Sequence, residues 1–243
     1  MKNFEPATSF GADVAARYDD DLRGDEEETV DFLAELAVGG PVLELAIGTG
    51  RIALPLAQRG LRVDGIDLSP EMVAQLRRKP GGDQIAVTMG DFAAVDVPGV
   101  YRLVYVVFNT LFNLLTQDDQ VRCFGNVAAH LNDDGSFLVE AFVPTFLHRL
   151  RDRQYVDAEA IAIDEVTLDV GRHDPVGQLL DESHVSLSAA GVRVVPIVTR
   201  YAWPSELDLM ARIAGLRLVG RWAGWNREPF GADSTRHVSV YSR

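Results

Sequence analysis

The stretch VLELAIGTGR at residues 42–51 joins a short apolar run to a glycine-rich turn. The apolar run is short and bounded by glycines, so it predicts a buried strand. Gly48 and Gly50 let the backbone pass close to a ligand that a Cβ would exclude. The residues after the turn predict a helix, whose first N–H groups lack partners within the helix. This unit predicts a ligand at the turn, although such turns also join strands to helices where nothing binds.

The chain around this unit alternates strands with helices. Ser69-Pro70 is a typical helix start, with a hydroxyl cap before a proline at the first helical position. Thr116-Gln117-Asp118-Asp119 resembles a capping box before another helix. The alternation predicts an α/β fold with a doubly wound, Rossmann-like parallel sheet. Further strands are predicted at residues 61–66, 85–89, 103–108 and 136–142.

Residues 144–203 interrupt the alternation. Glycine and proline turns separate three β-rich runs there, which predict antiparallel strands at residues 161–170, 178–188 and 192–201. Pro196 indicates that the last of these is an edge or bulged strand. We expect a small antiparallel β insertion that forms a lid or substrate region of a single domain, 1–243. Residues 1–40 predict an N-terminal helical segment, and a helix followed by two strands ends the chain.

Composition excludes several classes of protein. The formal charge is −13, from 36 acidic and 23 basic residues, so a nucleic-acid partner is not expected. The single cysteine, Cys123, allows no intrachain disulfide and favours a reducing, cytoplasmic location. No apolar run approaches the ~18 residues of a membrane span. The five histidines show no metal-ligand spacing, so no metal site is predicted.

Two cofactor classes compete for the glycine turn. Residues 48–53 also read G-x-G-x-x-A, the dinucleotide fingerprint, with Asp67 at a suitable distance for ribose hydroxyls. However, Glu44 ends the first strand, where its carboxylate would repel a pyrophosphate. The pair Asp91-Phe92 follows the third strand and suits an adenine, which offers an amine edge and an aromatic face. These features favour a cationic adenine-containing cofactor.

Taken in order, Glu44, Gly48, Gly50, Asp67 and Asp91-Phe92 resemble the class I S-adenosylmethionine-dependent methyltransferases, in the branch that methylates small molecules. The resemblance covers residues 15–243 and implies seven strands in the order 3-2-1-4-5-7-6. It implies S-adenosylmethionine as cofactor and methyl transfer to nitrogen or oxygen of an amine, amino sugar or natural product. One departure is Ala46, which replaces the family's first glycine. We expect a tolerable φ there.

The resemblance also implies roles for individual residues. Its cofactor-binding positions correspond to Tyr18, Glu44, Ala46, Gly48, Gly50, Asp67, Leu68, Met72, Asp91, Phe92, Phe108 and Asn109. Asn113, Tyr201 and Trp225 are expected at the acceptor. No catalytic residue is predicted, because the sulfonium is already a good leaving group and alignment supplies most of the rate. A cofactor-binding protein without transferase activity and an NAD-type oxidoreductase are the alternatives, and the sequence leaves a homodimer open.

The ribose assignment of Asp67 gives a first test. Asp67→Ala should weaken S-adenosylmethionine binding by about tenfold to several hundredfold, because charge-assisted hydrogen bonds contribute about 1.5–3 kcal/mol each. Asp67→Asn should be milder, and the fold is expected to survive. Calorimetric titration measures both. Unchanged affinity in Asp67→Ala would favour a helix-capping role instead.

Overall fold

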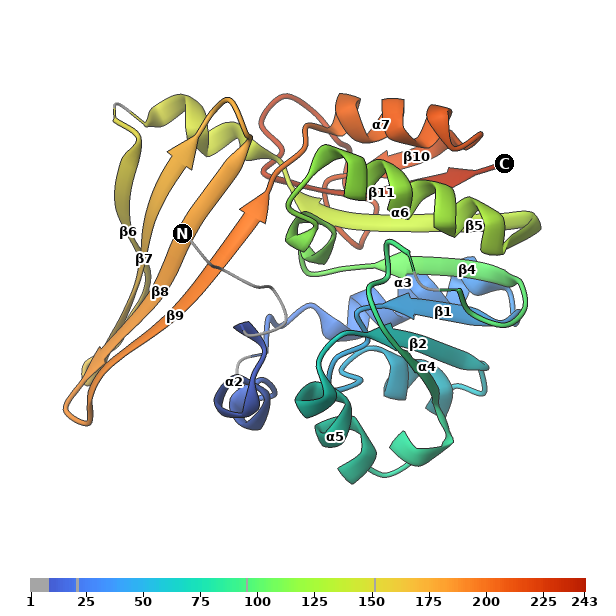
Figure 1. Cartoon of the computed structure of the whole chain (residues 1–243), viewed down its shortest axis with the longest axis horizontal. Helices are drawn as coiled ribbons and strands as arrows, with labels where there is room; N and C mark the ends of the chain where they lie inside the picture. Colours follow the sequence, from blue (N-terminus) through green and yellow to red (C-terminus); the bar gives the residue numbers. More distant parts are fainter. Residues whose placement is uncertain (1–8, 21, 95, 151) are drawn as a thin grey trace.

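A seven-stranded sheet forms the centre of the computed structural model, which describes residues 9–243 except positions 21, 95 and 151 (Figure 1). Its order is β3-β2-β1-β4-β5-β11-β10, and only β11 runs antiparallel to its neighbours. Since β10 and β11 are the sixth and seventh strands of this sheet, the predicted order is confirmed. The strands are β1 Val42–Leu45, β2 Val63–Asp67, β3 Ala86–Met89, β4 Tyr101–Val106, β5 Leu131–Phe142, β10 Arg217–Trp222 and β11 Arg236–Ser242.

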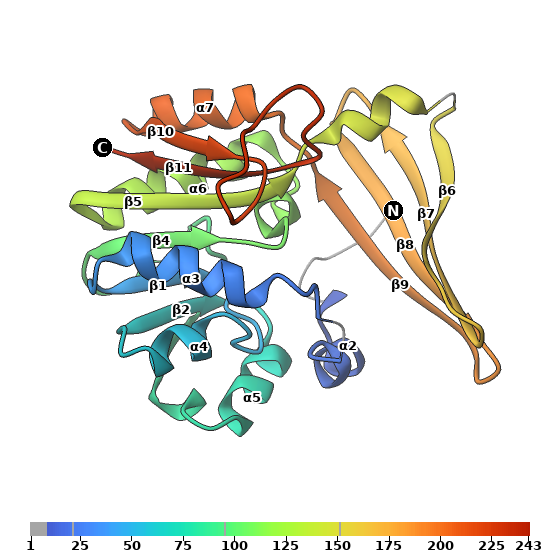
Figure 2. The same cartoon turned by 180° about the vertical axis from the view of Figure 1, so that it is seen from behind.

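Helices cover both faces of this sheet. Figures 1 and 2 show α6 and α7 over one face and α3 over the other. Each face packs its own core of buried apolar side chains. Within the described ranges, no helix is both long and apolar enough to cross a membrane. The α-helices are α2 Ala12–Arg17, α3 Glu26–Ala37, α4 Ala53–Gln58, α5 Pro70–Arg78, α6 Gln117–His130 and α7 Pro204–Ile213; the 3-10 turns are η1 Gly82–Gln84, η2 Thr110–Asn113 and η3 Pro144–Arg149.

The predicted helix starts are confirmed at atomic detail. The Ser69 hydroxyl accepts a hydrogen bond from the Met72 N–H at 3.1 Å, and Pro70 occupies the first helical position of α5. The Thr116 hydroxyl accepts from the Asp119 N–H at 3.0 Å and begins α6. Residues 1–8 of the predicted N-terminal segment lie outside the described residues.

A second sheet stands beside the first, beyond α2 (Figure 1). It is antiparallel, with four strands in the order β6-β7-β8-β9. Pro196 lies on β9 at the edge of this sheet, as its missing N–H predicts. The strand β6 is absent from the sequence-based prediction because nearly all its residues are exposed, so no apolar alternation marks it. The strands are β6 Gln154–Ile161, β7 Glu165–Asp174, β8 Leu179–Ser188 and β9 Gly191–Arg200.

A buried guanidinium joins the two sheets. Arg200, 5% exposed at the end of β9, donates to Gln120 of α6 at 2.6 Å and to Glu206 of α7 at 2.8 Å. Gln178 receives a third bond from Arg200 and donates to Glu206 at 2.9 Å. Because these partners lie on α6, on α7 and in the turn between β7 and β8, the network fixes how the antiparallel sheet is attached to the two helices.

Removing Glu206 should therefore destabilise the whole protein. Glu206→Ala leaves the Arg200 charge buried without its counter-ion, which typically costs about 3–5 kcal/mol. Urea unfolding measures the loss. The control Glu165→Ala removes an exposed carboxylate of β7 and should change stability by less than about 0.5 kcal/mol. Equal effects of the two variants would show that the network does not hold the sheets together.

Candidate functional site

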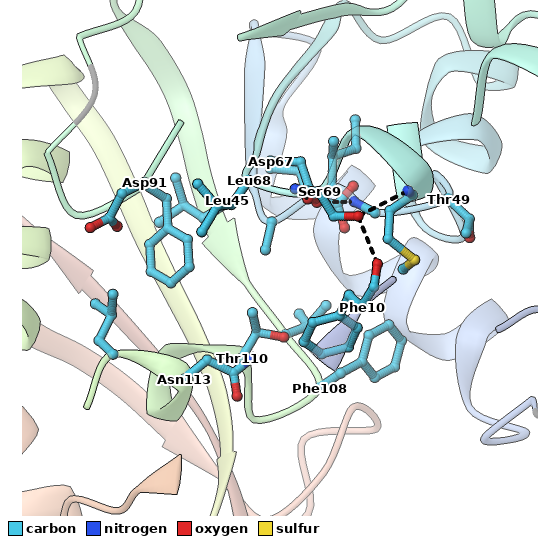
Figure 3. A pocket seen from close by; sticks show the side chains of 18 of the residues that line it. Phe10, Leu45, Thr49, Asp67, Leu68, Ser69, Asp91, Phe108, Thr110 and Asn113 are labelled. Atoms are coloured by element: carbon cyan, nitrogen blue, oxygen red, sulfur yellow. Dashed lines mark hydrogen bonds between the residues drawn. The ribbon is translucent and has the colours of Figure 1, made fainter. Parts of the chain in front are cut away.

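A cavity of about 340 Å³ lies at the carboxyl ends of the parallel strands (Figure 3). This is where ligands bind in open α/β sheets. Figure 3 shows Phe10 and Phe108 close together on one side and Asp91 at the other end. The predicted site residues that line this cavity are Tyr18, Glu44, Ala46, Gly48, Asp67, Leu68, Met72, Asp91, Phe92, Phe108 and Asn113.

The glycine turn adopts left-handed backbone at three alternate positions. The φ angles of Gly48 and Gly50 are 57° and 76°, which glycine adopts without strain. Ala46 also has φ 57°, so the expectation of a tolerable φ there is wrong. A Cβ in this region costs about 1–2 kcal/mol. Gly50 does not line the cavity; a Cβ there would lie 2.4 Å from Leu76 Cδ1, so its absence lets the turn pack on α5.

Asp67 holds this turn in place. One carboxylate oxygen accepts from the Gly48 N–H at 2.6 Å and the other from the Ser69 N–H at 2.8 Å. The residue is only 7% exposed. The helix cap of α5 is Ser69 rather than Asp67. Asp67→Ala would leave two buried N–H groups without acceptors. Each such group costs about 1–3 kcal/mol, so the substitution should cost more stability than the loss of a helix cap.

Glu44 places a carboxylate in the buried middle of the sheet. It is 4% exposed on β1, and its Oε2 has no hydrogen-bond partner among the described residues. Burial, reinforced by the nearby Asp67 carboxylate, raises the pKa of Glu44 to about 8. A carboxylate in this position lacks a counter-charge, and a cationic group of a ligand in the cavity would supply one.

Arg51 brings the opposite charge to the same cavity. Its guanidinium lies 4.4 Å from the centre of the Tyr18 ring, donates to the Tyr18 carbonyl and pairs with Glu26 at 3.7 Å. Its buried Nε has no partner among the described residues. An unpartnered carboxylate oxygen and an unpartnered guanidinium N–H in one cavity fit a zwitterion such as the methionine portion of S-adenosylmethionine.

The segment after β4 is strained. Phe108 and Asn109 have φ 60° and 61°, a conformation that non-glycine residues adopt only when their surroundings impose it. Glu140 of β5 accepts from the Phe108 N–H at 2.6 Å and also from Arg23 at 3.1 Å. The Asn109 side chain accepts from the Phe142 N–H at 2.7 Å. These bonds aim Phe108 at the cavity.

Residues 10–19 of the N-terminal segment cover the cavity. The Ser69 hydroxyl donates to the Phe10 carbonyl at 2.8 Å. Asp19 accepts from the Thr49 hydroxyl at 2.7 Å and pairs with Lys79 at 2.6 Å. Both ends of this segment are therefore tied to the glycine turn and α5, which fixes the half-buried Tyr18 between them.

A second cavity, of about 590 Å³, lies between this segment and the antiparallel sheet. It shares five lining residues with the first cavity, and these define the junction between the two. The junction residues are Phe10, Tyr18, Phe108, Thr110 and Asn113. Asn109 lines only the second cavity. A molecule in either cavity thus reaches the same five side chains.

Two predicted acceptor residues lie elsewhere. Tyr201 is 5% exposed, and its hydroxyl lies 3.0 Å from His173 Nε2. Trp225 is buried against Phe32, with ring centres 5.7 Å apart. Neither Tyr201 nor Trp225 is among the described residues that line the two cavities. Both side chains belong to the hydrophobic cores.

Sequence reasoning missed Phe10, Arg51 and Thr110. Thr110 adjoins the predicted pair 108–109, so position alone could have suggested it. Phe10 and Arg51 enter the site through contacts with residues 59 and 33 positions away, which no local pattern encodes.

Comparison with known proteins identifies the family. A model of the methyltransferase domain matches residues 42–135. The structure of the CcbJ methyltransferase from Streptomyces caelestis is 38% identical, with a TM-score of 0.92 over 98% of this chain and 99% of that chain. The chain is a class I S-adenosylmethionine-dependent methyltransferase. S-adenosylmethionine is therefore the cofactor of this methyltransferase.

Two further relatives are more distant. The cypemycin N-terminal methyltransferase of a Streptomyces species is 25% identical over 205 residues, which cover 84% of each chain. The S-adenosylmethionine-bound structure of CalS10, an amino pentose methyltransferase from Micromonospora echinaspora, is 21% identical. Its TM-score is 0.67 over 94% of this chain and 95% of that chain, a likeness of fold alone.

The strained alanine of the methyltransferase gives one prediction. Ala46→Gly should raise stability by about 0.5–1 kcal/mol, because relief of the left-handed strain exceeds the added entropy of the unfolded chain. That corresponds to a rise in Tm of about 1–3 °C. The matched control is Ala34→Gly in the middle of α3, which should lose about 1 kcal/mol. A lower Tm in Ala46→Gly would contradict the strain.

The buried acid gives a pH-dependent prediction. The pKa of Glu44 rises from 4.5 to about 8 on folding, so the folded protein holds a proton that the unfolded chain releases. The stability from this group is fully present below pH 4.5 and is lost as pH rises towards 8. The loss amounts to several kcal/mol, at about 1.4 kcal/mol per pKa unit.

Urea unfolding of the cofactor-free protein between pH 5 and 8 measures this loss of stability. Glu44→Gln should gain stability relative to the wild type as pH rises. Parallel pH profiles for the two proteins would contradict the raised pKa.

Proposed function

We propose that this methyltransferase transfers the methyl group of S-adenosylmethionine to a nitrogen atom of a small-molecule amine held in the second cavity. The observation that carries the proposal is the junction, where the two cavities share five lining residues. In-line displacement needs the nucleophile and the methyl group on one line with water excluded. A junction walled by three aromatic rings suits that requirement.

The cofactor roles follow from the charges in the first cavity. Glu44 is placed to hold the methionine ammonium and Arg51 the carboxylate. Asp67, already bonded to the turn, borders the ribose, with Leu68 and Met72 against the adenine. Asp91 and Phe92, which also line this cavity, would take the adenine edge. When bound, the cofactor supplies a methyl group activated by its sulfonium.

The junction favours nitrogen over oxygen as the acceptor atom. A hydroxyl usually needs a base, whereas a neutral amine attacks without one. Among the described junction residues, only Tyr18 has a titratable side chain. Burial raises the pKa of its hydroxyl further, so it stays protonated at neutral pH. The names of the two relatives, an N-terminal methyltransferase and an amino pentose methyltransferase, support an amine acceptor.

The antiparallel sheet then serves as the substrate region. It supplies much of the lining of the second cavity through β6, β7, β8 and β9. In this proposal, residues 144–203 act as the lid over the acceptor that the sequence leads us to expect. The acceptor must fit about 590 Å³, which suits a small molecule rather than a folded protein.

Incubation with methyl-labelled S-adenosylmethionine tests the proposal. Matched panels of small amines and alcohols are offered, and the label is followed by mass spectrometry. Label is expected on nitrogen in the amine panel. Label confined to alcohols would contradict the nitrogen assignment, and label on neither panel would contradict small-molecule transfer to these classes.

Tyr18 provides the matched variants. Tyr18→Phe keeps the ring at the junction and should retain kcat within about tenfold with an unchanged pH profile, since general-base catalysis contributes about 10²–10⁴-fold where it operates. Tyr18→Ala opens the junction to water and should lose more activity than Tyr18→Phe. A loss in Tyr18→Phe as large as in Tyr18→Ala would show that the hydroxyl takes part in proton transfer.

A further inference from the structure

The face of the antiparallel sheet that lines the second cavity is acidic. Cross-strand neighbours Asp157, Asp169 and His184 form one row across β6, β7 and β8. Two residues further along, Tyr155, Gly171 and Glu182 form the next row. Except for Gly171, these side chains line the cavity. An acceptor there meets a surface with three carboxylates.

Glu182 is held in a defined orientation. Tyr155 lies across Gly171, where a Cβ would be 2.3 Å from the ring, and its hydroxyl donates to Glu182 Oε1. The absence of a side chain at Gly171 is what lets a β6 residue reach β8. Glu182 Oε2 makes no hydrogen bond within the described residues, so one oxygen is fixed and the other is available.

A second polar group in the cavity lacks a partner. Thr199 on β9 is 6% exposed and lines the cavity, and its buried hydroxyl has no hydrogen-bond partner among the described residues. Buried hydroxyls are almost always bonded. A hydroxyl left alone in a cavity wall therefore points to a polar ligand group that completes it.

His184 does not neutralise this face. Its Nδ1 lies 2.6 Å from Asp169 and 3.4 Å from Glu159, and the hydrogen bond to Asp169 raises the pKa of His184 to about 9. The three side chains place donor atoms within 4.8 Å of one another. The protonated ring accounts for this group as an ion pair, so we assign no metal to it. No hydrogen bond from His184 reaches Glu182 within the described residues, so the Glu182 Oε2 stays available to a ligand.

We infer that Glu182 and Thr199, on the adjacent strands β8 and β9, form a cation subsite that recognises the ammonium group of an amine acceptor. The inference rests on the proposed function, because it treats the second cavity as the acceptor site. A carboxylate oxygen and a hydroxyl oxygen match two of the hydrogen-bond donors of an ammonium group.

The subsite also suits the charge that moves during transfer. After the ammonium proton has passed to water, the nitrogen lone pair forms a bond to the methyl carbon while the carbon–sulfur bond breaks. The bonding electrons go to sulfur, which leaves a neutral thioether and an N-methylated ammonium. Positive charge thus moves from the first cavity into the second, where carboxylates stabilise it.

Calorimetry of the protein saturated with S-adenosylhomocysteine tests the subsite without turnover. The probes are piperidine hydrochloride and its neutral isostere tetrahydropyran. The wild type should bind piperidinium at least about tenfold more tightly. Glu182→Gln should reduce this preference to about threefold or less, with S-adenosylhomocysteine affinity unchanged. The control is Asp181→Asn, which alters the next residue on the opposite face, where Asp181 pairs with Arg172 at 2.6 Å; it should keep the preference.

Equal affinity of the wild type for the two probes, or an unchanged preference in Glu182→Gln, overturns the subsite. The test separates this inference from the proposed function. Selective piperidinium binding supports the subsite even if no amine receives label, a result that would count against the proposed function alone. Labelled amine without any preference for piperidinium overturns the subsite alone.

Tyr155→Phe tests the positioning role of the tyrosine. Burial raises the pKa of Glu182, and the Tyr155 hydroxyl opposes that rise. Glu159, Asp169 and His184 also face this carboxyl. Without the hydroxyl, the pKa of Glu182 rises further. On acidification, Tyr155→Phe should therefore lose its preference for piperidinium at a higher pH than the wild type does. A purely structural role would weaken both probes equally at every pH, which would overturn the positioning role.

Discussion

The buried Glu44 carboxylate is the constraint on which the rest of the site depends. It lies in the middle of the sheet, where an ionised oxygen without a partner is costly unless a cation approaches. That requirement selects a cationic cofactor over a dinucleotide, although the glycine pattern of residues 48–53 admits both. Arg51 adds the complementary charge in the same cavity. The first cavity is thus organised around a zwitterion.

Backbone strain is concentrated around this cavity. Ala46, Phe108 and Asn109 all have φ near 60° and lie at the ends of β1 and β4. Buried carboxylates hold the neighbouring backbone, Asp67 beside the turn after β1 and Glu140 beside the segment after β4. Strain of this kind persists only when the surroundings impose it. The site is therefore rigid before any ligand arrives.

Local patterns were sufficient to predict the strands of the main sheet and the helix starts, whereas the order of the strands and most of the cavity lining followed from the family resemblance. Buried parallel strands are apolar runs, and Ser69 and Thr116 are marked by their own caps. The failures have physical causes. The strand β6 is exposed and lacks apolar alternation. Tyr201 and Trp225 are buried in the cores. Arg51 is held at the cavity by contacts with the N-terminal segment, which is distant in the sequence. The conformation of Ala46 is imposed by the turn, not encoded by its side chain.

Proton release on cofactor binding tests the central claim most directly. Near pH 7 the raised pKa, about 8, keeps most of Glu44 protonated in the free protein, and the bound ammonium should lower that pKa and expel the proton. Titration of S-adenosylmethionine in buffers of different ionisation enthalpy counts the protons. The wild type should release about one proton more than Glu44→Gln, and it should bind more tightly. Equal proton release by the two proteins would contradict the role of Glu44 as the counter-charge of the cofactor.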